Sequence, residues 1–91
     1  MEEAEIYETK HKNPFEVFIA ERIEEKGLKL LKLQEKLKMT SPTYYKLMKD
    51  PVQIKYAVMK KMAVTLEIDI IQIINKLDEA EKFLNKNKTK I

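Results

Sequence analysis

The sequence has 91 residues, a net charge of +3 and 36% charged residues, as expected for one globular domain with a modest core. It has no cysteine and one histidine, which excludes disulfides, thiolate chemistry and cysteine-bound zinc and leaves no evident set of residues for nucleophilic catalysis. We therefore expect a protein that is not an enzyme and that holds no metal or other cofactor. The sequence contains neither an apolar run of about 18 residues nor a signal peptide, so we expect a cytoplasmic protein without a membrane partner.

The charge is distributed unevenly along the chain. Residues 1–25 carry eight acidic and three basic residues, residues 26–61 carry ten lysines against two acidic residues, and residues 62–91 carry five of each. The middle segment therefore has a net charge of +8 between an acidic and a neutral end. A surface that faces phosphates would produce this pattern. Lysine is also common on solvated helix surfaces. This alternative explains any single lysine well, but it explains less well ten lysines against two acidic residues.

The first helix is predicted from its end signals. Residues 1–13 contain few apolar side chains and are predicted to form a flexible arm. Asn13 is a good N-cap and Pro14 a good first helical residue, so a helix is predicted over residues 14–26. Gly27, the only glycine, stands where a helix C-cap is needed. Three apolar residues at helical spacing are predicted to face inward: Phe15, Ile19 and Ile23.

Four more helices are predicted from the spacing of apolar residues and from start and stop signals. Asp50-Pro51 stops the third helix, and Asp69 and Gln72 have capping-box spacing at the start of the last. No stretch alternates as a strand would. The predicted helices run from 29 to 38, from Thr40 or Ser41 to about 49, from 53 to 66 and from 70 to 85, which gives a domain over residues 14–85 and a basic tail over 86–91.

The segment 27–47, GLKLLKLQEKLKMTSPTYYKL, has a specific order: a glycine-leucine pair, a short helix, a tight turn and another helix. This order resembles the lambda-repressor-like helix-turn-helix family (Cro/repressor type) of phage and bacterial regulators. Residues 62–66 and Ile68-Asp69 resemble the end of that family's fourth helix and the opening of its fifth, so the resemblance covers about residues 15–74. It implies an all-α fold of five helices in which the second and third form the helix-turn-helix.

The resemblance also implies a recognition helix whose first turn meets base edges in the DNA major groove. It places base-reading roles on Ser41, Pro42, Thr43 and Lys46, although capping is an equally good explanation of Ser41 and Pro42. Lysine can donate to guanine, and the threonine methyl can pack against thymine. Core packing is preferred for Tyr44. The predicted DNA-binding residues, phosphate contacts included, are Lys29, Lys32, Lys38, Thr40, Ser41, Pro42, Thr43, Tyr45, Lys46 and Lys49.

Five positions depart from the family pattern. Lys29 and Leu30 stand where the second helix usually has a serine or threonine cap followed by glutamine. Gln34 replaces a small residue, usually alanine, and Lys38 replaces the turn glycine. Met48 replaces a common glutamate in the recognition helix. A missing turn glycine is tolerated if its replacement avoids a positive φ or accepts a modest energetic cost.

The last predicted helix has more apolar width than one face of a small domain needs. Members of the family often dimerise through the last helix, which places two recognition helices one turn of DNA apart. The alternative is that this helix only closes the core of one protomer. The predicted dimerisation residues are Ile70, Ile71, Ile73, Ile74, Leu77 and Leu84.

The predicted function is sequence-specific binding of double-stranded DNA by a homodimeric transcriptional regulator, a repressor of a phage, plasmid or bacterial host. The alternative is a protein-interaction module, an antirepressor or accessory regulator, that keeps the helix-turn-helix but binds a protein partner. The departures from the family pattern favour the alternative, and the net charge of residues 26–61 favours DNA. In the predicted helix over residues 29–38, Leu30, Leu33 and Leu37 share one face. Leu30 and Leu31 cannot both be fully buried easily, so one of them marks a partner contact or this register shifts by one residue.

Overall fold

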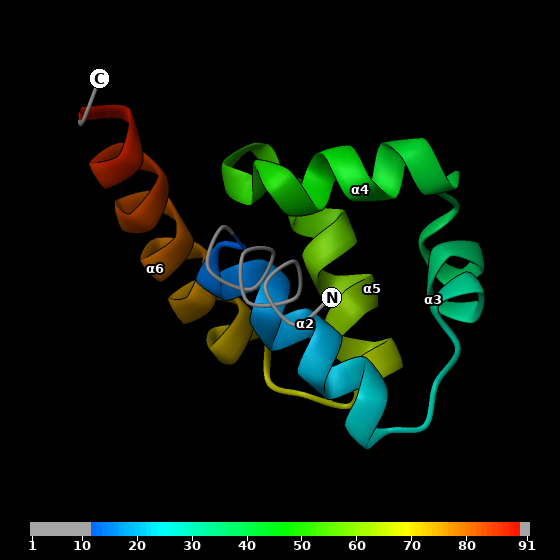
Figure 1. Ribbon diagram of the computed structural model, residues 1–91. Coiled ribbons are helices and arrows are strands. Elements are labelled where there is room, and N and C mark those ends of the chain that lie inside the picture. The colour runs from blue at the N-terminus through cyan, green and yellow to red at the C-terminus, as the bar shows by residue number, and fades with distance from the viewer. Residues whose placement is uncertain (1–11, 90–91) are drawn as a thin grey trace, which may run out of the picture.

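The computed structural model describes residues 12–89, and within that range it contains five α-helices, one short 3₁₀ helix and no strand (Figure 1). This confirms the prediction of an all-helical fold. Most of the predicted arm and the last two residues of the predicted tail lie outside the described residues. No helix in the described range is long and apolar enough to cross a membrane. The elements are α2 (Pro14–Glu25), α3 (Leu30–Leu37), α4 (Ser41–Lys49), η1 (Pro51–Gln53), α5 (Tyr56–Leu66) and α6 (Ile70–Thr89).

The predicted signals define both ends of α2. The side chain of Asn13 accepts a hydrogen bond of 2.9 Å from the backbone N–H of Glu16, and Pro14 follows as the first helical residue. At the other end Gly27 adopts a φ of 64°, in the left-handed region that favours glycine. The next backbone N–H, that of Leu28, donates to the carbonyl of Ile23 at 3.1 Å and closes the last turn.

Two further helices end on a left-handed residue that is not glycine. Lys38 follows α3 with a φ of 58°, and Glu67 follows α5 with a φ of 55°. The N–H groups of Met39 and Ile68 close the two turns at 2.9 and 3.0 Å. Each of these conformations costs about 1 kcal/mol for a residue with a Cβ atom. Lys38 therefore accepts the cost of a positive φ, which glycine would adopt more easily.

Two helix boundaries differ from the prediction. We predicted that the fourth helix begins at residue 53, but α5 begins at Tyr56, because Pro51 opens a separate 3₁₀ turn that ends in extended backbone at Ile54. Pro51 is buried there, and the turn packs against α6. We also predicted that the last helix ends near residue 85 with a basic tail from 86, but α6 continues to Thr89, since no proline or glycine stops it.

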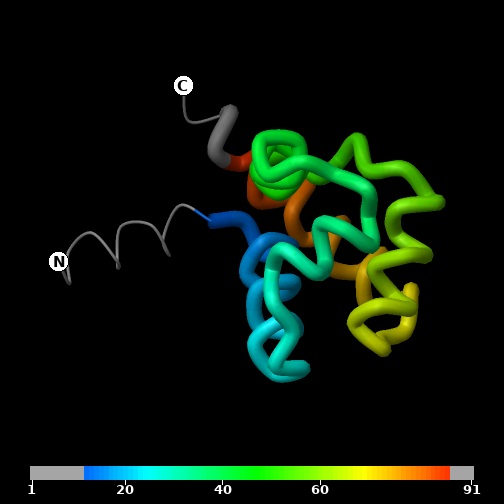
Figure 2. Tube along the Cα trace, turned by 90° about the vertical axis from the view of Figure 1, so that its right-hand side faces the viewer, coloured from blue at the N-terminus to red at the C-terminus, as the bar shows by residue number. Residues whose placement is uncertain are grey.

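The helices pack so that α4 lies along one edge of the molecule. In Figure 1 it crosses the top of the view above α5, with α3 beyond one of its ends, and Figure 2 shows it again at the top, viewed nearly along its axis. α6 packs mainly against α2, and α3 packs beside α5. One long side of α4 therefore faces away from the rest of the domain.

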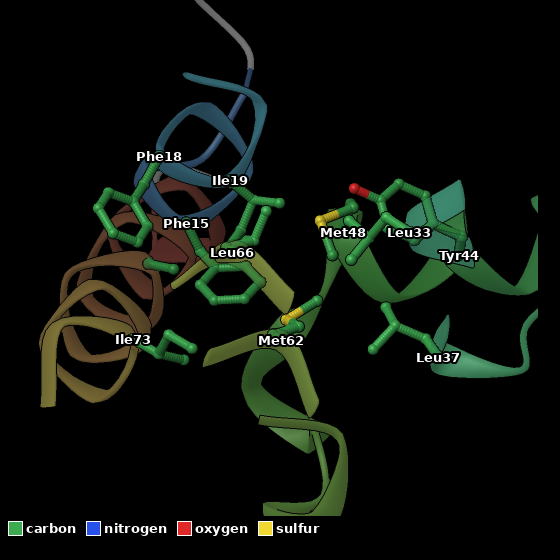
Figure 3. Packing of buried hydrophobic residues seen from close by; sticks show 11 residues of the cluster. Phe15, Phe18, Ile19, Leu33, Leu37, Tyr44, Met48, Met62, Leu66 and Ile73 are labelled. Atoms are coloured by element: carbon green, nitrogen blue, oxygen red, sulfur yellow. The ribbon is translucent and has the colours of Figure 1, made fainter. Parts of the chain in front are cut away.

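The core lies between α2, α5 and α6 and extends to the inner sides of α3 and α4 (Figure 3). α6 contributes Ile73 and Ala80, both fully buried and seven positions apart, which is two helical turns. α2 contributes Phe18 as well as two of the three residues predicted to face inward, whereas Ile23 is only partly buried. The buried apolar residues are Phe15, Phe18, Ile19, Leu33, Leu37, Tyr44, Met48, Met62, Leu66, Ile73 and Ala80.

Glu16, in the first turn of α2, gives the domain a pH-dependent stability. Burial raises the pKa of its carboxyl above 4.5, against the attraction of Lys12 and Lys49. Because the folded state favours the protonated form, the contribution of this group is fully present below pH 4.5 and is lost as the pH rises through the raised pKa. Glu16→Gln is therefore expected to raise the free energy of unfolding at pH 7 but not below pH 4.5. Urea unfolding at both pH values checks this. Glu21→Gln, on an exposed position of the same helix, is the control, and an unchanged stability of Glu16→Gln at pH 7 would contradict the prediction.

Candidate nucleic-acid interface

The outer side of α4 is polar and basic. Helical spacing turns Tyr44 and Met48 inward, where they are 4% and 2% exposed, and leaves Leu47 partly buried. No residue of α4 is acidic, and the first acidic residue after it is Asp50 at its C-cap. The exposed residues of α4 are Ser41, Pro42, Thr43, Tyr45, Lys46 and Lys49. A face without acidic groups therefore runs the length of a helix at the edge of the domain, with its two cations, Lys46 and Lys49, in the last turn.

All ten residues predicted to bind DNA are exposed. Seven of them lie on α4 or on its N-cap Thr40, and Lys38 is the C-cap of α3 just before them. Lys29 and Lys32 belong to the start of α3, which places Lys29 about 12 Å, one length of this helix, from the turn. Lys32 also forms an ion pair of 3.8 Å with Glu35. The structure thus brings the α4 residues and Lys38 close together, whereas the two α3 lysines lie farther away.

Hydroxyl groups at the start of α4 are already engaged with each other and with α3. The Thr40 hydroxyl donates to Thr43 Oγ1 at 3.1 Å, and the Ser41 hydroxyl donates to Gln34 Oε1 at 3.0 Å. Neither Thr40 nor Ser41 caps a backbone N–H with its side chain, so capping does not explain Ser41. The Thr43 hydroxyl accepts in its pair and keeps its own hydrogen to donate outward. Thr43 and Lys46 therefore keep free donors on this face.

Gln34 holds the turn between α3 and α4 from inside. It is 4% exposed, and its Oε1 accepts the hydrogen bond from Ser41. Its Nε2 is buried without a hydrogen-bond partner among the described residues. One of the two polar atoms of this amide thus loses water without gaining a partner among the described residues, which costs about 1–3 kcal/mol.

Gln34→Met is expected to stabilise the domain, because methionine fills a similar volume with no buried donor, and the exposed Ser41 hydroxyl can bond water instead. A gain of about 1 kcal/mol would raise the Tm by about 4–8 °C in a domain of this size. Thermal unfolding followed by circular dichroism measures the change. Gln34→Ala is the matched control, which leaves a cavity and should lower the Tm. A lower Tm for Gln34→Met would show that the amide is better satisfied than its contacts indicate.

Two adjacent tyrosines take different roles on α4. Tyr44 packs in the core as predicted, and burial, with smaller effects of Tyr45 and Glu16, raises the pKa of its hydroxyl to about 12. Its ring meets that of Tyr45 edge to face, with 5.6 Å between centroids and an interplanar angle of 79°. Tyr45 is 49% exposed. The buried ring thus orients the exposed one, whose hydroxyl is available to donate to a phosphate.

The predicted dimerisation residues do not share one surface. Ile73 is fully buried in the core of the protomer, so its assignment to a dimer interface is wrong. Ile70, Leu77 and Leu84 are partly buried. The exposed residues among the six are Ile71 and Ile74, which are 59% and 47% exposed. The core of the protomer therefore accounts for much of the apolar width of α6, because the inward stripe passes through Ile73 and Ala80 rather than through Ile70 and Ile74.

A second basic area was not predicted as a site. Lys60 and Lys61, on α5, line an open depression together with Lys36 and Lys38, at the end of α3. The excess of lysine in this part of the sequence was evident, but the packing of α3 beside α5 brings the four together. A helical pattern shows which residues are exposed but not which helices are neighbours.

Acidic and histidine side chains do not assemble a metal site in the part of the chain that the structure describes, where no three of the possible ligands come together. What the described surface offers instead is cations and hydroxyls on α4 and on the ends of α3 and α5. These groups suit an anionic ligand, since the ammonium groups can only donate hydrogen bonds and the hydroxyls can donate as well as accept. No protein-family model, curated protein or solved structure matches this chain.

Proposed function

We propose that this protein binds double-stranded DNA as a transcriptional regulator of the lambda-repressor-like kind, with α4 as the recognition helix. The observation that carries the proposal is the outer face of α4, where five of the six exposed residues are polar, aromatic or cationic, the sixth is Pro42, and none is acidic. This face lies at an edge of the domain, where a duplex can approach it (Figure 1). Base edges and phosphates are read by such donors.

The arrangement around α4 supports a helix-turn-helix. The 8-residue α3 and the 9-residue α4 are separated by the short turn over residues 38–40, whose left-handed first residue reverses the chain. A helix of nine residues is about 13 Å long. The DNA major groove, about 12 Å wide, admits a helix of this kind. The inner side of α4 is held in the core by Tyr44 and Met48, so the exposed residues of α4 keep a fixed orientation.

Titration of random and selected duplexes tests the proposal. Fluorescently labelled duplexes are titrated with the full chain at salt concentrations from about 50 to 200 mM, and selection from a random pool identifies the preferred site. We expect binding that weakens as salt rises, because each phosphate contact releases counterions, and a preferred site that binds more tightly than random DNA. Absence of binding at low salt would overturn the proposal in favour of a protein partner.

One observation favours the protein-interaction alternative. Leu30 packs against the core, whereas Leu31 is 68% exposed on α3, so the predicted register is correct and one leucine is left to water. Lys29 and Lys32 flank this pair, and their aliphatic stems can widen the apolar area. Leu31→Ser separates the two functions, because it should weaken a protein contact there and leave the affinity for DNA unchanged.

We also propose that the protein acts as a homodimer, now centred on the exposed Ile71 and Ile74. Two isoleucines are a small part of the roughly 800 Å² that each partner buries in a stable interface, so we expect a weak dimer. Sedimentation at micromolar concentration should show it, and Ile71→Ser with Ile74→Ser should give a monomer. Val64→Ser, at an apolar position of α5 that is 77% exposed, is the control. A monomeric wild type at high concentration would contradict the dimer without affecting DNA binding by one protomer.

A further inference from the structure

The open depression between α3 and α5 concentrates positive charge away from the face of α4. Its walls are Lys36, Lys38, Lys60, Lys61, Val64 and Thr65, with no acidic residue among them. The acidic residues nearest along the chain, Glu35 and Glu67, form ion pairs with Lys32 and Lys26 instead, at 3.8 and 2.7 Å. The four lysines of the depression therefore have no carboxylate partner in the ion pairs of the described residues.

The described residues give these four exposed cations little to interact with, which leaves them available to an anion. Lys38 holds a left-handed backbone where glycine would be less strained. Val64 is 77% exposed and offers the ammonium groups no hydrogen-bond acceptor from its side chain. Lys60 lies with its Nζ 5.3 Å from the centre of the exposed Tyr56 ring, the one cation–π contact that any of the four makes among the described residues. Four ammonium groups in an open site, with the Thr65 hydroxyl as the one side-chain acceptor among the lining residues, suit the phosphates of an extended polyanion.

The depression also includes a residue from the turn that leads into α4. Lys38 forms part of its wall and is at the same time the C-cap of α3, three positions before Ser41 opens α4. A duplex that meets the first turn of α4 and continues past it would therefore reach Lys38 first and then the lysines of α5.

We propose that this depression binds backbone phosphates of the same duplex beyond the stretch that α4 covers. This inference rests on the proposed function and adds to it a second contact that is independent of base sequence. It assigns Lys60 and Lys61 to DNA binding, together with Lys36 and Lys38. Its consequence is an affinity that depends on duplex length as well as on the preferred site.

The test compares two duplexes that contain the same selected site. One ends at the site, and the other extends by about 10 base pairs, one helical turn, at each end. The variant Lys60→Gln with Lys61→Gln is titrated against both at several salt concentrations. Lys26→Gln with Lys82→Gln is the matched control, since it removes the same charge from lysines that are paired with Glu67 and Asp78. Circular dichroism confirms that each variant is folded.

We expect the α5 variant to lose about tenfold in affinity for the long duplex, and the log–log salt slope to fall by up to about two units per protomer. Its affinity for the short duplex and its sequence preference should equal those of the wild type. The inference is overturned if the variant binds the long duplex as the wild type does, if both duplexes lose affinity equally, or if the control loses as much. If the wild type binds the short duplex, the proposed function survives each of these results. If the wild type binds neither duplex, the proposed function is wrong, and the inference about the depression is wrong with it.

Discussion

Asn13→Ala is expected to lower the free energy of unfolding by about 2–4 kcal/mol, because one side chain holds two helices. Its Oδ1 accepts from the N–H of Glu16 at 2.9 Å and caps α2, while its Nδ2 donates to the carbonyl of Met48 at 2.8 Å near the end of α4. Loss of an N-cap costs about 1 kcal/mol. Loss of a buried donor costs about 1–3 kcal/mol more, since Asn13 is 2% exposed and the carbonyl is left without that partner.

Urea unfolding of the wild type and two variants separates the two contributions. Asn13→Ser keeps a capping oxygen but is too short to reach Met48, so it should lose only the second part. If alanine and serine have equal effects, the cap contributes nothing measurable. A loss of less than about 1 kcal/mol for alanine would contradict the role of Asn13 as a tie between α2 and α4. Because this tie fixes one end of α4, its loss should also weaken binding to DNA.

Lys46→Ala is expected to reduce binding to the preferred duplex by about 1–3 kcal/mol, which is roughly 5- to 150-fold, and to relax the preference at one base pair. The reason is that Lys46 is exposed on α4 and forms no ion pair among the described residues, so its ammonium can donate to guanine O6 or N7. Thr43→Ala should have an effect of the same kind if its methyl group or free hydroxyl hydrogen meets a base.

Lys49→Ala is the matched control, because Lys49 lies on the same exposed face but is the last residue of α4, farthest from its first turn. It should weaken all duplexes about equally and lower the log–log salt slope by roughly one unit per protomer, since a phosphate contact acts through counterion release. Titrations of each variant against specific and random duplexes at several salt concentrations make the comparison. If Lys46→Ala and Thr43→Ala leave sequence preference unchanged while the wild type binds, the base-reading surface lies elsewhere.

The caps at both ends of α2 and at the start of α6, which depend on residues close together in the sequence, were predicted well. Asn13 and Gly27 define α2, Asp69 accepts from the N–H of Ile71, and Gln72 accepts from the N–H of Asp69, as local capping chemistry requires. The division of α4 into an inner and an outer side also follows from spacing alone.

Features that depend on packing between helices were missed. Ile73 and Ile74 are equally apolar, and only the position of α6 against α2 decides which one is buried. The burial of Gln34 depends on Ser41, seven positions later, and the lysines of α3 and α5 meet only because those helices are neighbours. In the candidate site, sequence therefore identified exposed residues on α4 but not the partners that orient them or the second basic area.

The two left-handed residues, Lys38 and Glu67, have opposite consequences for protein engineering. Glycine at either position would relieve the same backbone strain, so a screen for heat resistance would select both replacements. At position 67 the change removes only an exposed ion pair with Lys26, of a kind that contributes little. At position 38 the replacement by glycine deletes a cation at the junction of α3 and α4. If the proposed contacts form, the more heat-resistant protein would therefore bind a polyanion more weakly. Selection for thermal stability alone would therefore remove Lys38 without detecting the loss of affinity for a polyanion.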